Sequence, residues 1–388
     1  MKIVIAPDAY KESLTAMQVA TAIENGCKQI FPDAQYIKLP MADGGEGTVQ
    51  SLIDATGGSI VTASVTGPLG EQVDGFYGLM GDGKTAVIEM AAASGLHLVA
   101  PELRNPMKTT SYGTGELIKA ALEHGVEQII IGIGGSATND AGLGMAQALG
   151  VKMLDAQEND LGFGGEELAK LARIDTSAID PRLANITLQV ACDVNNPLCG
   201  EQGATQIFGP QKGATPEMVA QLDANLAHYA QIIKTQLAID VKDIPGAGAA
   251  GGLGAALIGL LGASLRPGIE IVMQAVNLSD IVKDADLVIT GEGRIDSQTI
   301  YGKTPIGVAR TAKRFSVPVI GIAGSLSADC SVVHQHGMDA VFSVVPGCVD
   351  LATAFAEAAH NIELTARNVA AVFGVALANN SLSTHHNR

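Results

Sequence analysis

The stretch KIVIAPDAYKES, at residues 2–13, joins a short apolar run to a polar loop. β-branched residues dominate Lys2–Ala6, which indicates a buried strand, and apolar residues at helical spacing over Thr15–Phe31 indicate a helix. Near the other end of the chain, Leu287–Thr290 and Thr304–Phe315 repeat the order of strand and helix. Strands that alternate with helices are typical of a parallel sheet covered by helices, so the sequence predicts an α/β fold.

The middle of the chain departs from this alternation. Residues 75–90 contain two strand-like runs around a Gly-Asp-Gly turn, a pattern typical of an antiparallel pair. We therefore expect two domains: a sheet domain formed by residues 1–65 together with 281–378, and an inserted second domain at 66–280. Residues 379–388 are polar, and we expect them to form a disordered tail. Open α/β sheets bind ligands at the carboxyl ends of their strands, so we expect a ligand cleft there, between the two domains.

Composition excludes several classes of protein. Of the 388 residues, 47% are hydrophobic and 16% are charged, which supports a large core and excludes a disordered chain. Lys and Arg number 24 against 40 Asp and Glu, so the net charge is -16, and no basic cluster indicates nucleic acid or an anionic membrane as partner. The five cysteines lack metal-site spacing, the first residues lack a signal peptide, and no apolar stretch reaches the ~20 residues of a membrane span. We expect a cytoplasmic protein.

Several segments place a loop rich in glycine and polar residues directly after an expected strand. The first loop, PDAYKES at 7–13, carries Asp8 and Lys11. A lysine just before a helix lies at the positive end of the helix dipole, where it is favourable only if an anion is shared. Ser13 or Thr15 is the expected N-cap of the helix that follows, and Ser13 is also a candidate ligand contact.

The second loop, MADGGEGT at 41–48, surrounds Asp43 and Glu46 with glycines. Glycines permit a close approach of the backbone to a ligand. The alternative is an ordinary turn in which Asp43 caps the helix expected at Thr48–Ala55.

The third loop, GIGGSATNDAG at 132–142, follows the strand expected at Gln128–Ile131. Its first residues match a relaxed dinucleotide-binding fingerprint, and Asp155 lies at about the offset, ~20 residues, where such folds place an acid. Its hydroxyl and amide groups suit a nest for phosphate or carboxylate equally well. The candidate ligand contacts in this loop are Gly134, Gly135, Ser136, Thr138 and Asn139.

The fourth loop, CDVNNPL at 192–198, offers Asp193 and Asn195 at a strand end. Carboxylate and amide oxygens there suit Mg²⁺ or a substrate with hydroxyl groups. The alternative is an Asx-turn before Pro197. A segment rich in glycine and proline further along the chain adds Lys212.

The fifth loop, TGEGRIDSQT at 290–299, holds both acids and cations and is followed by GKT at 302–304. GKT resembles the end of a phosphate-binding Walker A loop, but Ser297 occupies the position where that motif requires glycine, so the motif fails. The alternative is an ordinary solvated loop. The candidate functional residues in this segment are Glu292, Arg294 and Asp296.

Acids, lysines and an arginine at strand ends suit phosphoryl transfer. That reaction needs Mg²⁺ and cations to neutralise phosphate oxygens, and an acid to take the proton of the accepting hydroxyl. The sequence has no nucleophile elbow of a serine hydrolase and no pair of histidines at zinc-binding spacing.

Taken together, these loops match the text of one known family in its order and over nearly the whole chain. The matching segments are APDAYKESLTA at 6–16, MADGGEGT at 41–48, GIGGSATNDAG at 132–142, CDVNNPL at 192–198, FGPQKGA at 208–214, ITGEGRIDSQT at 289–299 and GKTP at 302–305. The chain thus resembles the type 1 glycerate kinases of bacteria. The resemblance implies an ATP-dependent kinase that converts D-glycerate to 2-phospho-D-glycerate with Mg²⁺, in the breakdown of glycolate, glyoxylate or aldarates. It also implies a Rossmann- or flavodoxin-like domain with a parallel sheet and a distinct inserted α/β domain.

Within that reaction we assign roles from the chemistry of each side chain. Lys11 and Arg294 contact the carboxylate of glycerate or the transferring phosphoryl group. Asp193 or Asp296 takes the proton of the substrate hydroxyl. The candidate Mg²⁺ ligands are Asp43, Glu46 and Glu292. The candidate contacts to substrate or phosphate are Asp8, Ser13, Gly134, Gly135, Ser136, Thr138, Asn139, Asn195 and Lys212.

Two other functions fit part of the sequence. An NAD(P)-dependent oxidoreductase of small hydroxy acids would use the loop at 132–142 together with Asp155. A non-catalytic sensor would bind glycerate without turning it over, although no DNA-binding or partner helix supports it. The oligomeric state stays open between a monomer and a homodimer.

Overall fold

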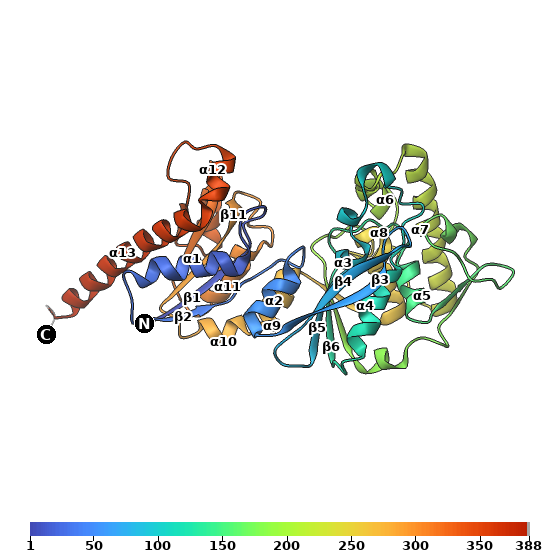
Figure 1. The fold of residues 1–388 in the computed structure, drawn as a ribbon, viewed down its shortest axis with the longest axis horizontal. Coiled ribbons are helices and arrows are strands. Elements are labelled where there is room, and N and C mark those ends of the chain that lie inside the picture. The colour runs from blue at the N-terminus through green and yellow to red at the C-terminus, as the bar shows by residue number, and fades with distance from the viewer. Residues whose placement is uncertain (386–388) are drawn as a thin grey trace. The chain divides into compact units, whose positions relative to one another are not determined.

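The computed structural model describes residues 1–385 of the chain. These residues form two compact units. Unit 1 combines Met1–Asp43 with the chain from Val272 onward, and unit 2 is Gly44–Ile271. Unit 1 therefore contains both ends of the chain, blue and red in Figure 1, and unit 2 contains the middle.

Unit 1 is built on a sheet of parallel strands. The strands are β1 (Lys2–Pro7), β2 (Gln35–Lys38), β11 (Leu287–Ile295), β12 (Val319–Leu326) and β13 (Ala340–Ser343). Among the described residues this sheet is five-stranded, its order is β13-β12-β11-β1-β2, and every neighbouring pair is parallel. The apolar runs predicted as strands at the two ends of the chain are neighbours in its middle, which confirms the α/β fold class.

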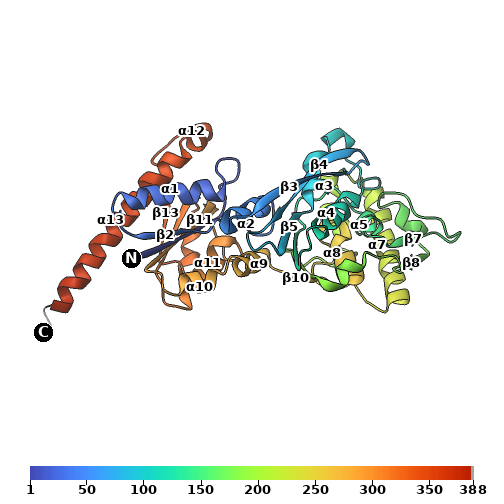
Figure 2. The same cartoon turned by 60° about the horizontal axis from the view of Figure 1, so that its bottom comes forward.

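Helices cover both faces of this sheet. They are α1 (Ala16–Lys28), α10 (Leu278–Val282), α11 (Thr304–Lys313), α12 (Leu351–Ala356) and α13 (Ala358–His385). Ile3 and Ile5 join one buried cluster with residues of α1 and α13. Val4, between them, points to the opposite face because side chains alternate along a strand. Figure 2 shows α10 and α11 on that side.

Helix α13 continues through a segment that we predicted to be a disordered tail. The chain is helical as far as His385, so the prediction is wrong for 379–385, and 386–388 lie outside the described residues. Ile362 and Val369 pack on α1 as part of the core of unit 1, and the Phe373 ring meets the Phe31 ring edge-on at 6.4 Å. A helix fixed by such packing extends at little further cost, because each added residue contributes a hydrogen bond.

Unit 2 contains a mixed sheet. Its strands are β3 (Ser59–Thr66), β4 (Gln72–Leu79), β5 (Thr85–Glu89), β6 (Gln128–Gly132), β9 (Thr187–Ala191) and β10 (Ser264–Arg266). Within residues 1–385 it is six-stranded, in the order β10-β9-β6-β5-β4-β3. β3, β4 and β5 are antiparallel, which confirms the pair predicted within 75–90, whereas β5, β6, β9 and β10 are parallel.

The division between the two units differs from the predicted domain boundaries. Strand β3 and the preceding helix α2 (Thr48–Thr56) belong to unit 2, because β3 pairs with β4 along its whole length. The sequence analysis assigned both to the first domain, since a helix followed by a strand continues the alternation of the N-terminal segment. The return to unit 1 falls within helix α9 (Gly268–Ala275) instead of at residue 281.

Short helices and a small second sheet complete unit 2. The α-helices are α3 (Ala91–Ser94), α4 (Tyr112–Leu122), α5 (Leu143–Ala148), α6 (Ala204–Phe208), α7 (Pro216–Leu237) and α8 (Ala249–Leu261). β7 (Lys152–Leu154) and β8 (Arg173–Asp175) form an antiparallel pair of their own. No helix in the described part of the chain combines the length and apolarity that crossing a bilayer requires.

Candidate active site

The strand order of unit 1 reverses at β1. From β1 the chain runs to β2 on one side and later returns to β11 on the other. Such a reversal leaves a crevice at the carboxyl ends of the central strands, where open α/β sheets bind ligands. A cavity of about 420 Å³ lies here, lined by the loop after β1, the end of β11 and helix α12. All of its lining residues belong to unit 1.

Strand β11 extends further than the sequence analysis predicted. It runs to Ile295 instead of ending at Thr290, because its pairing with β12 continues beyond the end of β1. Glu292 and Arg294 are therefore strand residues and not loop residues. They are two positions apart, so their side chains point to the same face, and both line the cavity.

Asp8, Asp43 and Glu292 bring carboxylates together in the cavity wall. Thr304 Oγ1 donates to Asp8 Oδ2 at 2.6 Å, and the Ala9 N–H donates to Asp8 Oδ1 at 2.7 Å. Burial is the main cause that raises the pKa of Asp8 to about 7, and the nearby charges of Asp43 and Glu292 add to it. A cation bound among these acids would relieve their repulsion.

Lys303 also lines the cavity, although the sequence analysis did not select it as a functional residue. Its Nζ lies 3.4 Å from Glu292 Oε2 and 3.9 Å from Asp296 Oδ1. Thr299 Oγ1 donates to Glu292 Oε1 at 2.7 Å. Burial raises the pKa of Glu292, and the Thr299 hydrogen bond and the Lys303 charge oppose that effect. Lys303 and Thr304 lie at the start of α11. The sequence GKT directly before a helix could have indicated Lys303 as a functional residue, but we did not select it because the full Walker A motif fails.

Lys11 and Arg294, which we predicted to contact the carboxylate or the phosphoryl group, both line the cavity, whereas Asp296 is not one of its lining residues. Arg294 is 66% exposed, and its Nε lies 3.5 Å from Asp296 Oδ2. Asp296 Oδ1 accepts a hydrogen bond from the Gln298 N–H at 2.9 Å. Because Arg294 and Lys303 flank it, Asp296 is placed to orient these two cations.

Ser13 lines the cavity but does not cap helix α1. Its hydroxyl donates to the carbonyl of Phe355 at 3.3 Å, which joins the loop after β1 to α12. Thr15 is the N-cap: its Oγ1 accepts from the Gln18 N–H at 3.2 Å, and Gln18 Oε1 accepts from the Thr15 N–H at 2.9 Å. Of the two caps left open by the sequence, the structure selects Thr15.

In unit 2, the loop after β6 folds around the buried carboxylate of Asp140. This carboxylate accepts hydrogen bonds from the N–H and hydroxyl of Ser111 and from the N–H groups of Gly142 and Gly144. Burial raises the pKa of Asp140 against these hydrogen bonds. The network fixes the backbone of the loop from its inner side.

Thr138 and Asn139 lie inside unit 2 and are fully buried. Asn139 Nδ2 donates to Thr205 Oγ1 at 2.9 Å, whereas Thr138 Oγ1 and Asn139 Oδ1 have no hydrogen-bond partner among the described residues. The sequence analysis predicted that both side chains contact phosphate or substrate. In this structure both side chains are enclosed and the exposed part of the loop is Gly134 and Gly135, so a ligand contact of Thr138 and Asn139 stays a prediction.

Lys212 is a buried support of the same loop. Its Nζ donates to Ser136 Oγ at 2.8 Å and to the Thr138 carbonyl at 2.7 Å. Burial lowers the pKa of Lys212 to about 7, and the charge of Asp140 opposes that shift. The sequence analysis predicted that Lys212 and Ser136 contact the ligand; the structure brings them together beneath the exposed glycines, with both side chains buried.

Glycines of the second predicted loop serve close packing within unit 2. A Cβ on Gly44 would lie 2.6 Å from the Cβ of Ala191, at the end of β9. A Cβ on Gly132 would lie 2.5 Å from the Gly44 carbonyl oxygen. We predicted that the backbone of this loop approaches a ligand closely. At Gly44 the backbone instead lies close to the ends of β9 and β6.

Helix α2 is capped by a distant acid and not by Asp43. Glu89, at the end of β5, is buried, and its Oε1 accepts from the Val49 N–H at 2.8 Å. Burial raises the pKa of Glu89, and the nearby charge of Glu46 adds to it. Glu46 is exposed in unit 2 and does not join Asp43 in the cavity wall, so the structure does not support its prediction as a Mg²⁺ ligand.

Asp193 and Asn195 follow the end of β9, and both are exposed. Asp193 Oδ1 accepts a hydrogen bond from the Gly268 N–H at 3.0 Å. This backbone contact gives an exposed carboxylate a fixed orientation at a strand end, as a general base requires.

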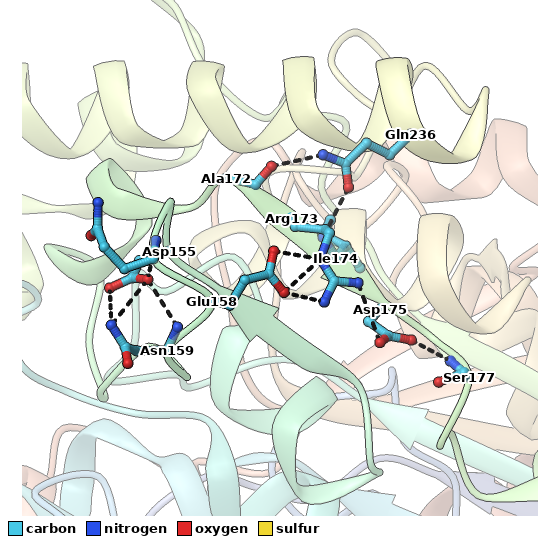
Figure 3. Close-up of polar contacts among 10 residues, drawn as sticks. Asp155, Glu158, Asn159, Ala172, Arg173, Ile174, Asp175, Ser177 and Gln236 are labelled. Atoms are coloured by element: carbon cyan, nitrogen blue, oxygen red, sulfur yellow. Dashed lines mark hydrogen bonds and ion pairs between the residues drawn. The ribbon is translucent and has the colours of Figure 1, made fainter.

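The geometry around Asp155 argues against dinucleotide binding. That fold places the acid at the end of a strand within the same parallel sheet. Asp155 instead follows β7, which pairs only with β8 outside the six-stranded sheet of the described chain. Its Oδ1 accepts from the N–H groups of Asn159 at 2.9 Å and Gln157 at 2.8 Å; Figure 3 shows Asp155 and Asn159 closing a local turn. These hydrogen bonds lower the pKa of Asp155.

Comparison with known proteins matches the chain to one family. The model of the glycerate kinase family matches residues 3–374. The chain belongs to the glycerate kinase family. This confirms the resemblance that the loops indicated.

Relatives of this glycerate kinase family member are similar over nearly their full lengths. A glycerate kinase of Haemophilus influenzae is 63% identical, with 96% of this chain and 98% of the relative covered. The glycerate 2-kinase of Escherichia coli is 62% identical, with 98% and 100% covered. A crystal structure described as a glycerate kinase 2 from Salmonella typhimurium LT2 superposes with a TM-score of 0.91 at 60% identity, covering 97% of this chain and 99% of that one.

The carboxylates of this glycerate kinase family member fit a metal that is shared with its substrate. Among residues 1–385, no group of three or more His, Cys, Asp or Glu side chains is arranged to hold an ion by itself. Mg²⁺ keeps several waters and takes one or two carboxylates together with substrate phosphates. Asp8, Asp43 and Glu292 meet that need, because all three line one cavity, and burial together with the charges of Asp43 and Glu292 raises the pKa of Asp8.

Proposed function

We propose that this protein transfers the γ-phosphoryl group of ATP to the hydroxyl at C2 of D-glycerate. The observation that carries the proposal is the cavity at the carboxyl ends of β1 and β11, where lysines and an arginine meet carboxylates. The names of the relatives, glycerate kinase and glycerate 2-kinase, support the substrate and the position. In the reaction the C2 oxygen forms a bond to the γ-phosphorus, the bond from that phosphorus to the β–γ bridging oxygen breaks, and ADP leaves.

The cations of the cavity suit a reaction between two anions. ATP and glycerate are both negative, and the protein carries a net charge of -16, so binding needs local positive charge. Lys11 forms no ion pair with the described residues, and Arg294 is 66% exposed, so both can turn toward a phosphate or carboxylate. Fixed cations of this kind stabilise the charge that develops on the transferring group.

Asp8, Asp43 and Glu292 would hold Mg²⁺, which supplies neutralisation of the phosphate oxygens when bound. One or two of these carboxylates are enough for that ion. Lys303, 3.4 Å from Glu292, keeps this carboxylate in place at the cavity wall.

We assign the proton of the substrate hydroxyl to Asp193. Asp296, the other candidate, lies 3.5 Å from Arg294 Nε and 3.9 Å from Lys303 Nζ, and we assign it the orientation of these two cations. Asp193 is exposed and held in orientation by the Gly268 N–H. A carboxylate can accept this proton late in a loose phosphoryl-transfer transition state.

Release of ADP by the purified protein tests the proposal. The reaction contains ATP, Mg²⁺ and D-glycerate, and L-glycerate, glycolate and no acceptor serve as controls. We expect ADP to form with D-glycerate far faster than with any control. Equal rates in all four reactions, or no ADP at all, would overturn the proposal.

A further inference from the structure

The cavity of unit 1 has an apolar part that phosphoryl transfer does not explain. Beyond the charged residues, its wall includes the segment after β13, helix α12 and the start of α13. The apolar side chains of this part are Val344, Val345, Leu351, Ala354, Phe355 and Ala358.

The size of the cavity points to a ligand larger than glycerate. Its volume of about 420 Å³ is within the range, about 300–1,000 Å³, of sites that hold drug-sized molecules. Glycerate is a three-carbon acid whose surface is mostly oxygen, so it would leave the apolar part empty. A flat aromatic base can bury its faces against such side chains.

Asn361 brings a buried amide to the apolar part. Ala358 and Asn361 lie three residues apart on α13, so they share a helix face, and both line the cavity. Asn361 is 6% exposed as a residue, and its side-chain amide, which is bonded to no other described residue, is open to the cavity that it lines. An amide that faces a cavity can gain a hydrogen bond from a ligand bound there, so a ligand that pairs with Asn361 is favoured.

We propose that the adenine base of ATP occupies this apolar part and that the Asn361 amide pairs with the amino group and N7 of the base. The proposal rests on the proposed function, in which ATP is the phosphoryl donor. An asparagine offers one donor and one acceptor side by side, which matches this edge of adenine. Guanine presents two acceptors at the same edge, so the amide satisfies only one of them. The triphosphate extends toward Lys11, Arg294 and Lys303 in the same cavity.

Two variants and one control test the inference. Asn361→Leu keeps the size of the side chain and removes both hydrogen-bonding groups. Ala354→Leu fills the apolar part from the side of α12. Asn368→Leu makes the same replacement at an exposed position of α13 and is the matched control. Equilibrium dialysis of ADP without glycerate gives the dissociation constant, and steady-state kinetics give KM for ATP, GTP and D-glycerate.

We expect Asn361→Leu to weaken ADP binding about tenfold to 100-fold, the effect of losing a bidentate contact to adenine. The preference for ATP over GTP should fall by a similar factor, and KM for ATP should rise more than KM for D-glycerate. Ala354→Leu should weaken ADP binding, and Asn368→Leu should change nothing.

Unchanged ADP affinity in both cavity variants would overturn the inference, as would a rise in KM for D-glycerate alone, which would assign the cavity to the acid. The proposed function fails separately. If the wild-type protein binds ADP through Asn361 but does not phosphorylate D-glycerate, the acceptor is wrong and the base site stands.

Discussion

Replacing Asp8 should stabilise the folded protein above neutral pH and abolish its kinase activity. The pKa of Asp8 rises from the ordinary 3.8 to about 7 in the folded protein, so over this pH interval the folded chain holds a proton that the unfolded chain has released. The free energy of unfolding therefore falls as pH rises through the interval, by about 1.4 kcal/mol for each pH unit. The full cost of ionised Asp8 above pH 7 is about 4 kcal/mol. We expect Asp8→Asn to recover about 2–4 kcal/mol at pH 8, because Asp43 and Glu292 share the effect.

Urea unfolding at pH 4.5 and pH 8 measures this prediction. The Asn carbonyl can still accept the Thr304 hydroxyl, so the packing is retained. Asp8→Asn should gain stability over the wild type at pH 8, show almost no gain at pH 4.5, and lose kinase activity. Mg²⁺ with ADP should stabilise the wild type at pH 8 more than the variant. Asp155→Asn, which removes an acid whose pKa is lowered, is the control and should gain nothing at either pH. An equal gain for Asp8→Asn at both pH values, or a loss at pH 8, would refute the reasoning.

Three further predictions concern unit 2. Folding lowers the pKa of Lys212 from 10.5 to about 7, so between these pH values the unfolded chain binds one proton more than the folded chain. The free energy of unfolding of the wild type should therefore rise relative to that of Lys212→Met by about 1.4 kcal/mol per pH unit from pH 7 to 10. Urea unfolding at pH 7 and 9.5 measures this difference, and a difference that does not depend on pH would contradict the prediction. Asp193→Asn should lower kcat at least ~10²-fold, and near-normal turnover in the ADP assay would remove it as the base. Gly132→Ala places a Cβ 2.5 Å from the Gly44 carbonyl oxygen and should cost about 1–3 kcal/mol in urea unfolding. Gly347→Ala, with open space around it, is its control, and equal stabilities would contradict the packing argument.

The strands of the parallel sheet could be predicted because their apolar runs are local signals. Lys2–Ala6 and Leu287–Thr290 are β-branched and bounded by polar loops, and both are strands in the structure. Strand pairing is not local. The extension of β11 to Ile295 depends on β12, and the transfer of β3 to unit 2 depends on β4, and neither partner can be read from the strand itself.

The candidate site could be predicted in part for the same reason. Polar segments after the predicted strands led us to Asp8, Lys11 and Arg294, and the structure brings these three residues into one cavity. Other candidates are buried in the structure, which the sequence does not reveal. Thr138, for example, is polar and follows a glycine-rich turn, yet the chain that packs around it encloses its side chain. Asn361 was missed because a single amide on a long helix has no sequence signature, and only the cavity gives it a role.

The phosphorus NMR spectrum of the reaction product tests the central claim most directly. The purified protein is incubated with ATP, Mg²⁺ and D-glycerate, and the proton-coupled ³¹P signal of the new phosphate ester is recorded. A phosphate on the C2 oxygen couples to one proton and gives a doublet, which is the result we predict. A triplet would place the phosphate on the C3 oxygen, and a spectrum with unchanged ATP would contradict the assignment as a glycerate kinase.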